Sequence, residues 1–190
     1  MAFTYSITDQ GAMHFITCTV VQWADVFTRK VYISVIEDSL NFCIEKKGLV
    51  VYGYVIMSNH IHLLVQAKDN NLSDVWRDFK KFTSQQITKA IEANTGESRK
   101  RWLTWLLTSE KATEKNPAAY RFWQPDNGAE LCFSLPFMWQ KLDYIQNNPV
   151  RAEIVGKADE YKSSSAADYF YGKQIGRVKI AWLDAMVVTV

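Results

Sequence analysis

The first third of the chain alternates short apolar runs with polar breaks. Residues 14–27, HFITCTVVQWADVF, open with β-branched and aromatic residues and predict a strand. Two further runs, LVVYGYVIM at 49–57 and HIHLLVQA at 60–67, are separated only by Ser58 and Asn59. A short polar pair between two β-rich runs is typical of an antiparallel hairpin, so we expect His60 at or just after a turn.

Longer segments with a period near 3.6 residues follow both of these β-rich parts. Residues 29–48 predict a helix that stops at Gly48, and residues 71–94 predict a second helix with Ser73 as a candidate N-terminal cap. The spacing of the apolar positions marks each segment as helical. These positions are Val31, Val35, Leu40, Phe42, Leu72, Val75, Phe79, Phe82, Ile87 and Ile91.

Residues 95–130 interrupt this rhythm. They combine a basic cluster, three tryptophans, two prolines and the turn-forming sequence PDNG, and they predict a helix, a long loop and a short strand near 120–124. Residues 134–148 are again helical, with Ser134 as a candidate cap and an end by Asn148, because a proline follows. The apolar stripe of this helix, which we expect to dock on the sheet, is Met138, Leu142 and Ile145.

The order strand, helix, hairpin, helix, helix predicts an α+β or α/β sandwich with a largely antiparallel central sheet and flanking helices. A chain of 190 residues is long enough to bury one proper core, and the sequence contains no internal repeat, linker or low-complexity tract. We therefore expect a single domain over residues 1–190.

Composition and charge exclude broad disorder and any bulk cationic character. The chain is 48% hydrophobic and 22% charged with a net charge of +2, so a nucleic-acid partner would have to meet a local basic patch. Cys18, Cys43 and Cys132 are far apart in apolar surroundings, which favours buried free thiols in a reducing compartment. No apolar run is long enough to cross a bilayer, so we expect a cytoplasmic protein without a membrane partner.

Two histidines, His60 and His62, lie one residue apart inside an apolar run. Residues i and i+2 of a strand point to the same face, about 6.5 to 7 Å apart, so the two imidazoles project together. Such a pair can share one divalent ion, or the rings can be core histidines bonded to backbone carbonyls. The spacing leaves both interpretations open, and a third ligand would have to come from elsewhere.

The last predicted helix carries a candidate nucleophile. Tyr144 and Asn148 are one helical turn apart and share a face with Lys141. An amide oxygen is an acceptable ligand for a hard ion such as Mg2+ or Mn2+, and a tyrosine beside that ion could attack a polarised phosphate. An exposed tyrosine at a polar helix end is the alternative that these residues alone leave open.

Two distant blocks resemble the signature segments of one protein family. YVIMSNHIHLLV at 54–65 and KLDYIQNNPVRAEIV at 141–155 resemble those of the IS200/IS605-type single-tyrosine (Y1) transposases, and look closest to the REP-associated tyrosine transposases. The similarity continues through FITCTVVQWADVFTRK, NLSDVWRDFKKFTS, RFWQPDN and SSSAADY, so it covers most of the chain.

The resemblance implies a ferredoxin-like or RRM-like HUH domain, with a family-variable insertion around 95–125. His60 and His62 match the family's ligands for Mg2+ or Mn2+, Tyr144 matches its nucleophile, and Asn148 stands where a polar third ligand is often found. The implied enzyme is a metal-dependent single-stranded DNA endonuclease and strand transferase. It nicks and rejoins hairpin-flanking sites through a 5′-phosphotyrosine intermediate, and both a homodimer and a monomer are open.

Two positions depart from the family pattern. Family members commonly have His where this chain has Gln146, and Gly where it has Glu153. The first change could alter contacts beside the site, and the second removes a flexible glycine where the chain leaves the helix. Neither change removes a core catalytic group.

Basic side chains on the second helix and at the start of the 95–130 segment are candidates for DNA contacts, with Trp102, Trp105 or Trp123 stacking on unpaired bases. The alternative is a solvated basic face with core tryptophans. Other functions also remain open: a domesticated hairpin-binding protein without cleavage, a rolling-circle replication initiator, or a small zinc hydrolase. The candidate basic residues are Arg77, Lys80, Lys81, Arg99, Lys100 and Arg101.

Overall fold

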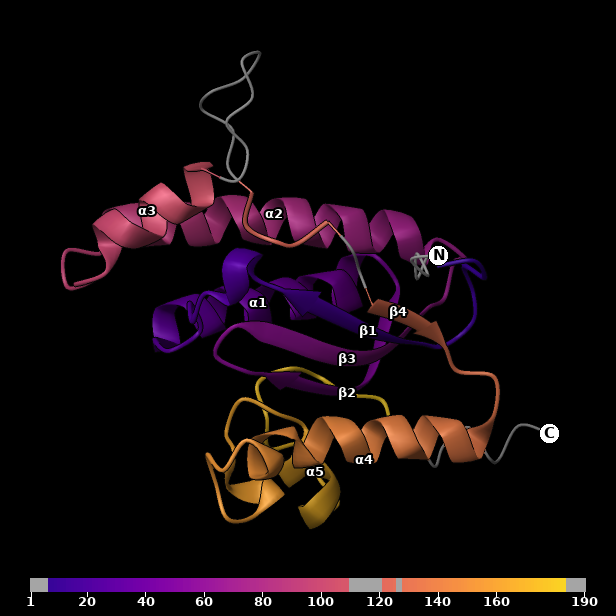
Figure 1. Ribbon diagram of the computed structural model, residues 1–190. Coiled ribbons are helices and arrows are strands. Elements are labelled where there is room, and N and C mark those ends of the chain that lie inside the picture. Colours follow the sequence, from indigo (N-terminus) through magenta and orange to yellow (C-terminus); the bar gives the residue numbers. More distant parts are fainter. Residues whose placement is uncertain (1–6, 110–120, 126–127, 184–190) are drawn as a thin grey trace, which may run out of the picture.

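The computed structural model describes residues 7–109, 121–125 and 128–183, and within them the strands form one four-stranded sheet (Figure 1). The order is β2-β3-β1-β4, and all neighbouring strands are antiparallel. Because β1 and β2 both pair with β3, they run parallel to each other, which is the split βαβ arrangement of ferredoxin-like folds. This confirms the predicted α+β class. The strands are β1 His14–Thr19, β2 Leu49–Ile56, β3 His60–Ala67 and β4 Gly128–Leu131.

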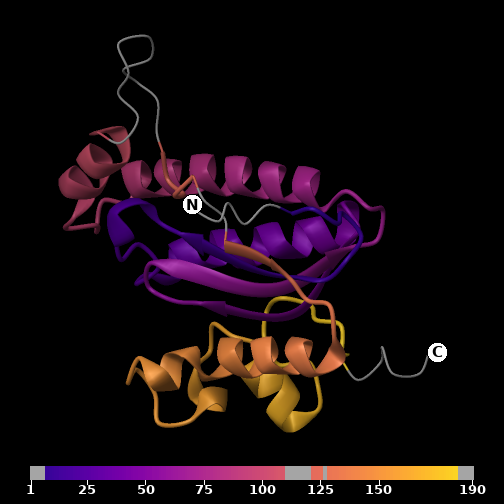
Figure 2. The same cartoon turned by 45° about the vertical axis from the view of Figure 1, so that its right-hand side comes forward.

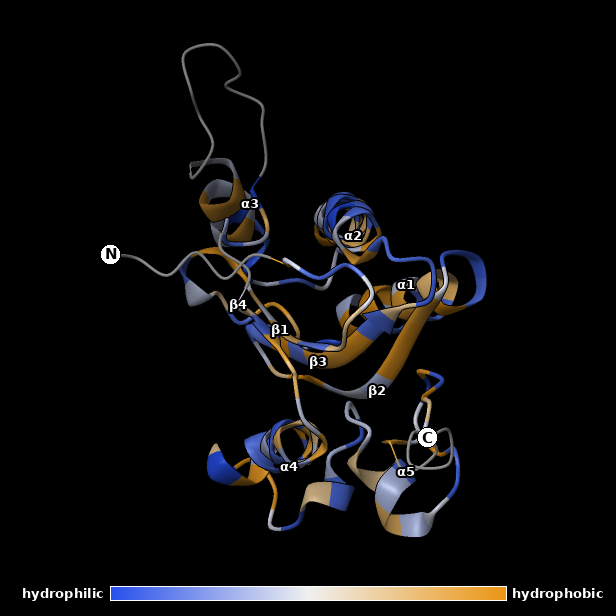
Figure 3. Ribbon diagram, turned by 90° about the vertical axis from the view of Figure 1, so that its right-hand side faces the viewer, coloured by the Kyte–Doolittle hydropathy of each residue, from blue (hydrophilic) through white to orange (hydrophobic). Residues whose placement is uncertain are grey.

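Helices cover both faces of the sheet (Figures 1 and 2). One face carries α1 and α2, and the other carries α4 and α5, as the end-on view in Figure 3 shows. The α-helices are α1 Lys30–Lys46, α2 Leu72–Ala93, α3 Lys100–Ser109, α4 Leu135–Arg151 and α5 Ala166–Tyr171, and the short 3-10 turns are η1 Val21–Trp23 and η2 Ala158–Glu160.

Strand β3 supplies side chains to two separate cores because its residues alternate between the faces. Ile61 and Leu63 are buried in the larger core under α1 and α2. Leu64 belongs to the smaller core, where it meets Leu142 and Ile145 of α4. The predicted docking of the last helix through this apolar stripe is therefore confirmed.

The prediction of which side of α1 is buried is wrong by about one residue. Val31 and Phe42 are 48% and 55% exposed, whereas Tyr32 and Ile36 are fully buried. Apolar residues surround most of this helix, so the period predicts a helix without deciding which side meets the sheet. In α2 the predicted apolar positions are buried except Phe82, which is 52% exposed.

Two predicted helix ends differ in the structure. The cap of α2 is Asn71 instead of Ser73, whose backbone N–H donates to the side chain of Gln10. Helix α4 continues past the expected end at Asn148 to Arg151 and contains Pro149. A proline removes one backbone donor and only disfavours a helical residue before it, so the last turn of a packed helix can absorb it.

Part of the irregular segment is described. Its predicted helix is α3, but the strand lies at Gly128–Leu131, and in the described residues 121–125 only an isolated bridge joins Trp123 to Val20. Most of the predicted long loop falls at 110–120, outside the described residues, and the single domain with an insertion at 95–125 stays a prediction. Ser134 does occupy the cap position of α4, without a side-chain hydrogen bond.

The three cysteines are free and buried, as predicted. In the part of the chain that the structure describes, none of the helices is both long enough and apolar enough to cross a bilayer. The cytoplasmic location stays a prediction.

Candidate functional site

Strand β3 places both histidines of the HxH segment on the face that α4 covers. His60 lies opposite Thr19 and His62 opposite Thr17 in the β1–β3 register. The ring centroids of the two histidines are 4.6 Å apart with an interplanar angle of 70°. The predicted projection to one face is confirmed, and the two rings form a convergent pair.

Hydrogen bonds hold one nitrogen of each ring. Nδ1 of His62 lies 2.8 Å from Thr17 Oγ1, and Nδ1 of His60 lies 2.7 Å from Asn59 Oδ1. The Asn59 oxygen can only accept, so His60 Nδ1 carries the proton and its Nε2 presents a lone pair. Neither Nε2 atom has a hydrogen bond within the described residues. A hydrogen bond to Nδ1 is the usual means by which proteins orient a histidine that binds a metal ion through Nε2.

Burial keeps both imidazoles neutral. It lowers the pKa of His60 below its usual value. Burial, the neighbouring His60 and the cation of Lys141 together lower the pKa of His62 to about 3. Neutral imidazole is the form that binds a metal ion, so the pair fits a divalent cation without the need to lose a proton first.

Helix α4 brings Tyr144 to this pair from some eighty residues further along the chain. The centroid of its ring lies 5.3 Å from that of His62 and 5.8 Å from that of Phe15, and the side chain is 37% exposed. Gly53 permits this approach of α4 to the sheet, because a Cβ there would lie 2.4 Å from Leu142 Cδ1. The structure thus places a partly exposed phenol beside a pair of neutral imidazoles.

Three contacts around Tyr144 were not predicted from the sequence. Phe15 stacks on the ring of His62 at 5.3 Å and 21°. The guanidinium of Arg151 lies over the ring of Tyr144 at 5.0 Å, and Lys141 Nζ lies over the ring of Phe15 at 4.7 Å. The spacing does contain a signal for Arg151, because residues seven apart are two turns apart on one helix face.

The third metal ligand stays a prediction. Asn148 follows Tyr144 by one turn, is partly buried, and its side-chain amide makes no hydrogen bond within the described residues. Those residues contain no cluster of three or more His, Cys, Asp and Glu side chains that could hold a metal. A cation on the histidine pair would therefore need oxygen ligands of another kind, which an amide can supply.

The two departures from the family pattern lie at the end of α4. Gln146 is partly buried, and its Nε2 atom has no hydrogen-bond partner among the described residues. Glu153 has a φ of 58°, a left-handed conformation in which glycine is favoured. The structure therefore shows why a glycine suits this position.

The six basic candidates lie on α2 and α3 or just before α3, on the other side of the sheet from the histidines (Figure 3). Arg77 pairs with Asp74 and Asp78. Arg99 holds the buried carboxylate of Glu97, and Lys80 Nζ donates to the carbonyl of Gln124. Lys81 and Arg101 are exposed and Lys100 is partly buried. Their contacts with DNA stay predictions.

Of the three candidate stacking residues, Trp123 is too deeply buried to stack on a base. It is only 5% exposed and donates a hydrogen bond to Thr83. Trp102 and Trp105 are 45% and 64% exposed. Trp123 forms part of the wall of a groove of about 780 Å³ between α2 and residues 121–125, which also includes Lys81, Lys89 and Arg121.

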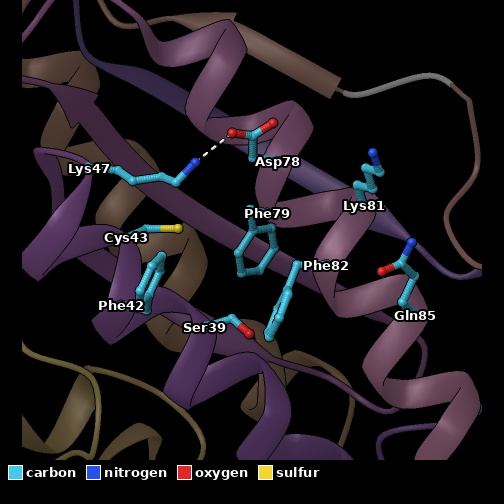
Figure 4. A pocket seen from close by; sticks show the side chains of 9 residues that line it. All are labelled: Ser39, Phe42, Cys43, Lys47, Asp78, Phe79, Lys81, Phe82 and Gln85. Carbon is cyan, nitrogen blue, oxygen red and sulfur yellow. Dashed lines mark hydrogen bonds and ion pairs between the residues drawn. The ribbon is translucent and has the colours of Figure 1, made fainter.

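A separate apolar pocket of about 430 Å³ lies between α1 and α2 (Figure 4). Phe42 and Phe82 line it, and the ion pair between Lys47 and Asp78 lies at one end. Burial raises the pKa of the Cys43 thiol in its wall to about 11, so this thiol is a poor nucleophile. The pocket is on the opposite side of the sheet from Tyr144 and is not part of the candidate site.

Comparisons with known proteins identify the family and the fold. The family model for "Transposase IS200 like" matches residues 8–105, a little over half of the chain. The solved structure of a REP-associated tyrosine transposase bound to a REP hairpin is similar at a TM-score of 0.60 and 16% sequence identity, over 91% of this chain and 87% of that one. At this identity the likeness shows the fold alone. No curated protein matches.

Proposed function

Because this chain belongs to the IS200-like transposase family, we propose that it nicks and rejoins single-stranded DNA beside hairpins, with Tyr144 as the nucleophile. The observation that carries the proposal is the 5.3 Å separation between the rings of His62 and Tyr144. These residues come from elements that are distant in sequence, and the family match covers the histidines but ends before the tyrosine.

In the proposed step the phenolic oxygen of Tyr144 attacks the phosphorus of a DNA phosphodiester. The new bond joins this oxygen to phosphorus, the bond from phosphorus to the 3′ oxygen breaks, and the phenol proton is lost while the 3′ oxygen becomes a hydroxyl. The product is a 5′-phosphotyrosine ester, which keeps the energy of the broken bond. A second 3′-hydroxyl can therefore reverse the step and join strands without ATP.

His60 and His62, with Asn148 as the proposed third ligand, would hold a divalent cation of the Mg2+ or Mn2+ type. Such a cation withdraws charge from the phosphate that it contacts. The chain's own residues supply the rest of the site. Thr17 and Asn59 orient the imidazoles, and the guanidinium of Arg151 lies over the Tyr144 ring, where it can stabilise negative charge near the phenol.

A hairpin with a single-stranded flank is the proposed substrate. The similar solved structure contains a REP hairpin, and the Tyr144 side chain is 37% exposed, so an unpaired strand beside a hairpin could reach its phenol from solvent. Whether one or two copies of the chain act together stays a prediction, and so does the cytoplasm as the compartment.

The test is covalent capture of labelled DNA. Wild-type protein with Mn2+ and an oligonucleotide hairpin carrying a single-stranded flank is expected to form an SDS-resistant protein–DNA adduct. Tyr144→Phe should lose the adduct by at least about 1,000-fold but bind the hairpin normally, because it lacks only the nucleophilic oxygen. Tyr171→Phe, which alters a tyrosine on α5 that is 55% exposed, is the matched control and should react like wild type.

Other outcomes would favour the rival functions. A strong gel shift with no adduct from wild-type protein indicates a hairpin-binding protein that no longer cuts. Zinc-dependent hydrolysis that Tyr144→Phe leaves intact indicates a hydrolase. Undiminished cutting in EDTA, or in His62→Ala, contradicts the proposed metal site.

A further inference from the structure

The most exposed large apolar side chain in the described residues lies between β4 and α4. Phe133 is 79% exposed, and one face of its ring stacks on Phe137 at a centroid distance of 5.2 Å and an interplanar angle of 15°. Since Phe137 covers only one face, the other face is open to solvent. A flat aromatic group could extend this stack at the geometry that aromatic pairs prefer.

Ring contacts connect Phe133 to the candidate nucleophile. Lys141 Nζ lies between two rings, 4.9 Å from the centroid of Phe137 and 4.7 Å from that of Phe15. The ring of Phe15 in turn meets the ring of Tyr144 at 5.8 Å. We call this continuous series of side chains the aromatic track: Phe133, Phe137, Lys141, Phe15 and Tyr144.

We propose that the exposed end of the aromatic track binds an unpaired base of single-stranded DNA near the phosphate that Tyr144 attacks, with this base stacked on the open face of Phe133. The inference rests on the proposed function, because it takes the single-stranded flank of the substrate as the ligand. Every base has a π-face, so stacking of this kind tolerates any sequence. Phe137 and Tyr144 are two helical turns apart, about 10 Å, which is the length of about three stacked nucleotides.

Single-stranded DNA fits the track better than a second protein chain does. The track joins the exposed ring of Phe133 to the partly exposed ring of Tyr144 through a middle in which Phe15 is only 7% exposed, so a strand would contact its two ends. Its middle carries the cation of Lys141, which protein interfaces tend to exclude from their centres. Lys141 also donates to Glu130 Oε2, so part of its charge is compensated and the rings supply the main contact.

The experiment measures the affinity for a fluorescein-labelled single strand of fifteen thymidines by anisotropy. Phe133→Ala is expected to raise the Kd by about 10-fold, in the range found when a stacking residue is removed, and Phe133→Trp is expected to keep the wild-type Kd. A blunt hairpin without a flank should bind equally to all three proteins. Phe170→Ala removes another exposed ring, 70% exposed on α5 and outside the track, and should leave the Kd unchanged.

Two results would overturn the inference. In the first, the wild-type protein does not bind the single strand; in the second, the Phe133→Ala protein binds it with the wild-type Kd. A fall from dimer to monomer mass in light scattering with unchanged affinity for the strand would instead identify Phe133 as a contact between copies of the chain. Adduct formation reports separately on the proposed function. If wild-type protein forms no adduct but Phe133→Ala still weakens binding of the strand, the nuclease proposal fails and the track stands.

Discussion

At Glu153 the backbone takes a left-handed conformation directly after the C-cap of α4, with φ at 58°. For a residue with a Cβ this conformation costs about 1–2 kcal/mol, whereas glycine adopts it freely. The side chain is exposed, so packing does not offset that cost. The departure from the family's glycine therefore places strain where the chain leaves the helix that carries Tyr144.

Glu153→Gly is expected to stabilise the protein by about 0.5–1 kcal/mol, which is the relief of strain minus the extra freedom that glycine gives the unfolded chain. Urea unfolding followed by circular dichroism measures this change. Glu153→Ala is the control, because it removes the carboxylate and keeps the unfavourable φ. If the alanine variant were stabilised as much as the glycine variant, charge and not backbone strain would be the cause.

The residues of the site also show how far single side chains could be predicted. The HxH spacing was enough to place His60 and His62 on one face, because the two-residue period of a strand is a local property. Their hydrogen-bond partners could not be predicted in this way. Thr17 comes from β1, and only the register of the β1–β3 pair brings it opposite His62.

Among the secondary-structure elements, the contact between β2 and α4 decides where Tyr144 lies. Gly53 follows an irregularity in the register of the β2–β3 pair, and it leaves room for Leu142 to pack directly on the strand. Leu142 and Ile145 are buried at 1% and 0% exposure on either side of Tyr144. The position of the phenol is thus set by close packing of a helix on a strand that lacks a side chain at this point.

Gly53→Ala is expected to destabilise the protein by about 1–3 kcal/mol and to reduce adduct formation, because a Cβ would lie 2.4 Å from Leu142 Cδ1 and would displace α4. Thermal unfolding and the adduct assay measure the two effects. Gly156→Ala is the control, since its Cβ would make only an ordinary contact at 3.6 Å with Glu160 Oε2. A Gly53→Ala protein of wild-type stability would contradict the role assigned to this close approach.

The helices illustrate two limits of prediction from the sequence, one of apolar periodicity and one of the proline rule. In α1 apolar residues occur around most of the helix, so the pattern could not show that Tyr32 and Ile36 are buried while Val31 and Phe42 are exposed. In α4 the proline rule predicted an end at Asn148, but the helix continues to Arg151. That extra turn matters, because it places the guanidinium of Arg151 over the Tyr144 ring.

At the scale of the whole molecule the sheet separates two surfaces. The histidines, Tyr144 and the aromatic track lie on the α4 side. The basic candidates and the groove lined by Lys81, Lys89 and Arg121 lie on the α2 side. With a net charge of only +2, any electrostatic grip on DNA depends on such local groups. We therefore expect the α2 side to contribute to affinity and the α4 side to carry out the chemistry.

The double variant Lys81→Ala/Lys89→Ala tests this division. Each phosphate contact contributes about 0.9 to the slope of log K against log salt for duplex DNA, so the slope for a hairpin is expected to fall by about two. Adduct formation at saturating DNA should stay at the wild-type level. Lys179→Ala is the control, because that lysine pairs with Glu45. A double variant with an unchanged salt slope would show that the hairpin stem does not reach this groove.

By itself the sequence determined those features that depend on neighbouring residues: strands β1, β2 and β3 and the main helices, the common direction of the two histidines, and the free buried cysteines. Its resemblance to one family connected Tyr144 with the histidine pair, a link that no local period contains. The tertiary structure alone decided which face of α1 is buried, where α4 ends, and which basic groups are already paired within the protein. It also decided that Phe15 and Arg151 meet Tyr144. The physical reason is that such features arise from contacts between segments far apart in the chain, and local spacing does not encode those contacts.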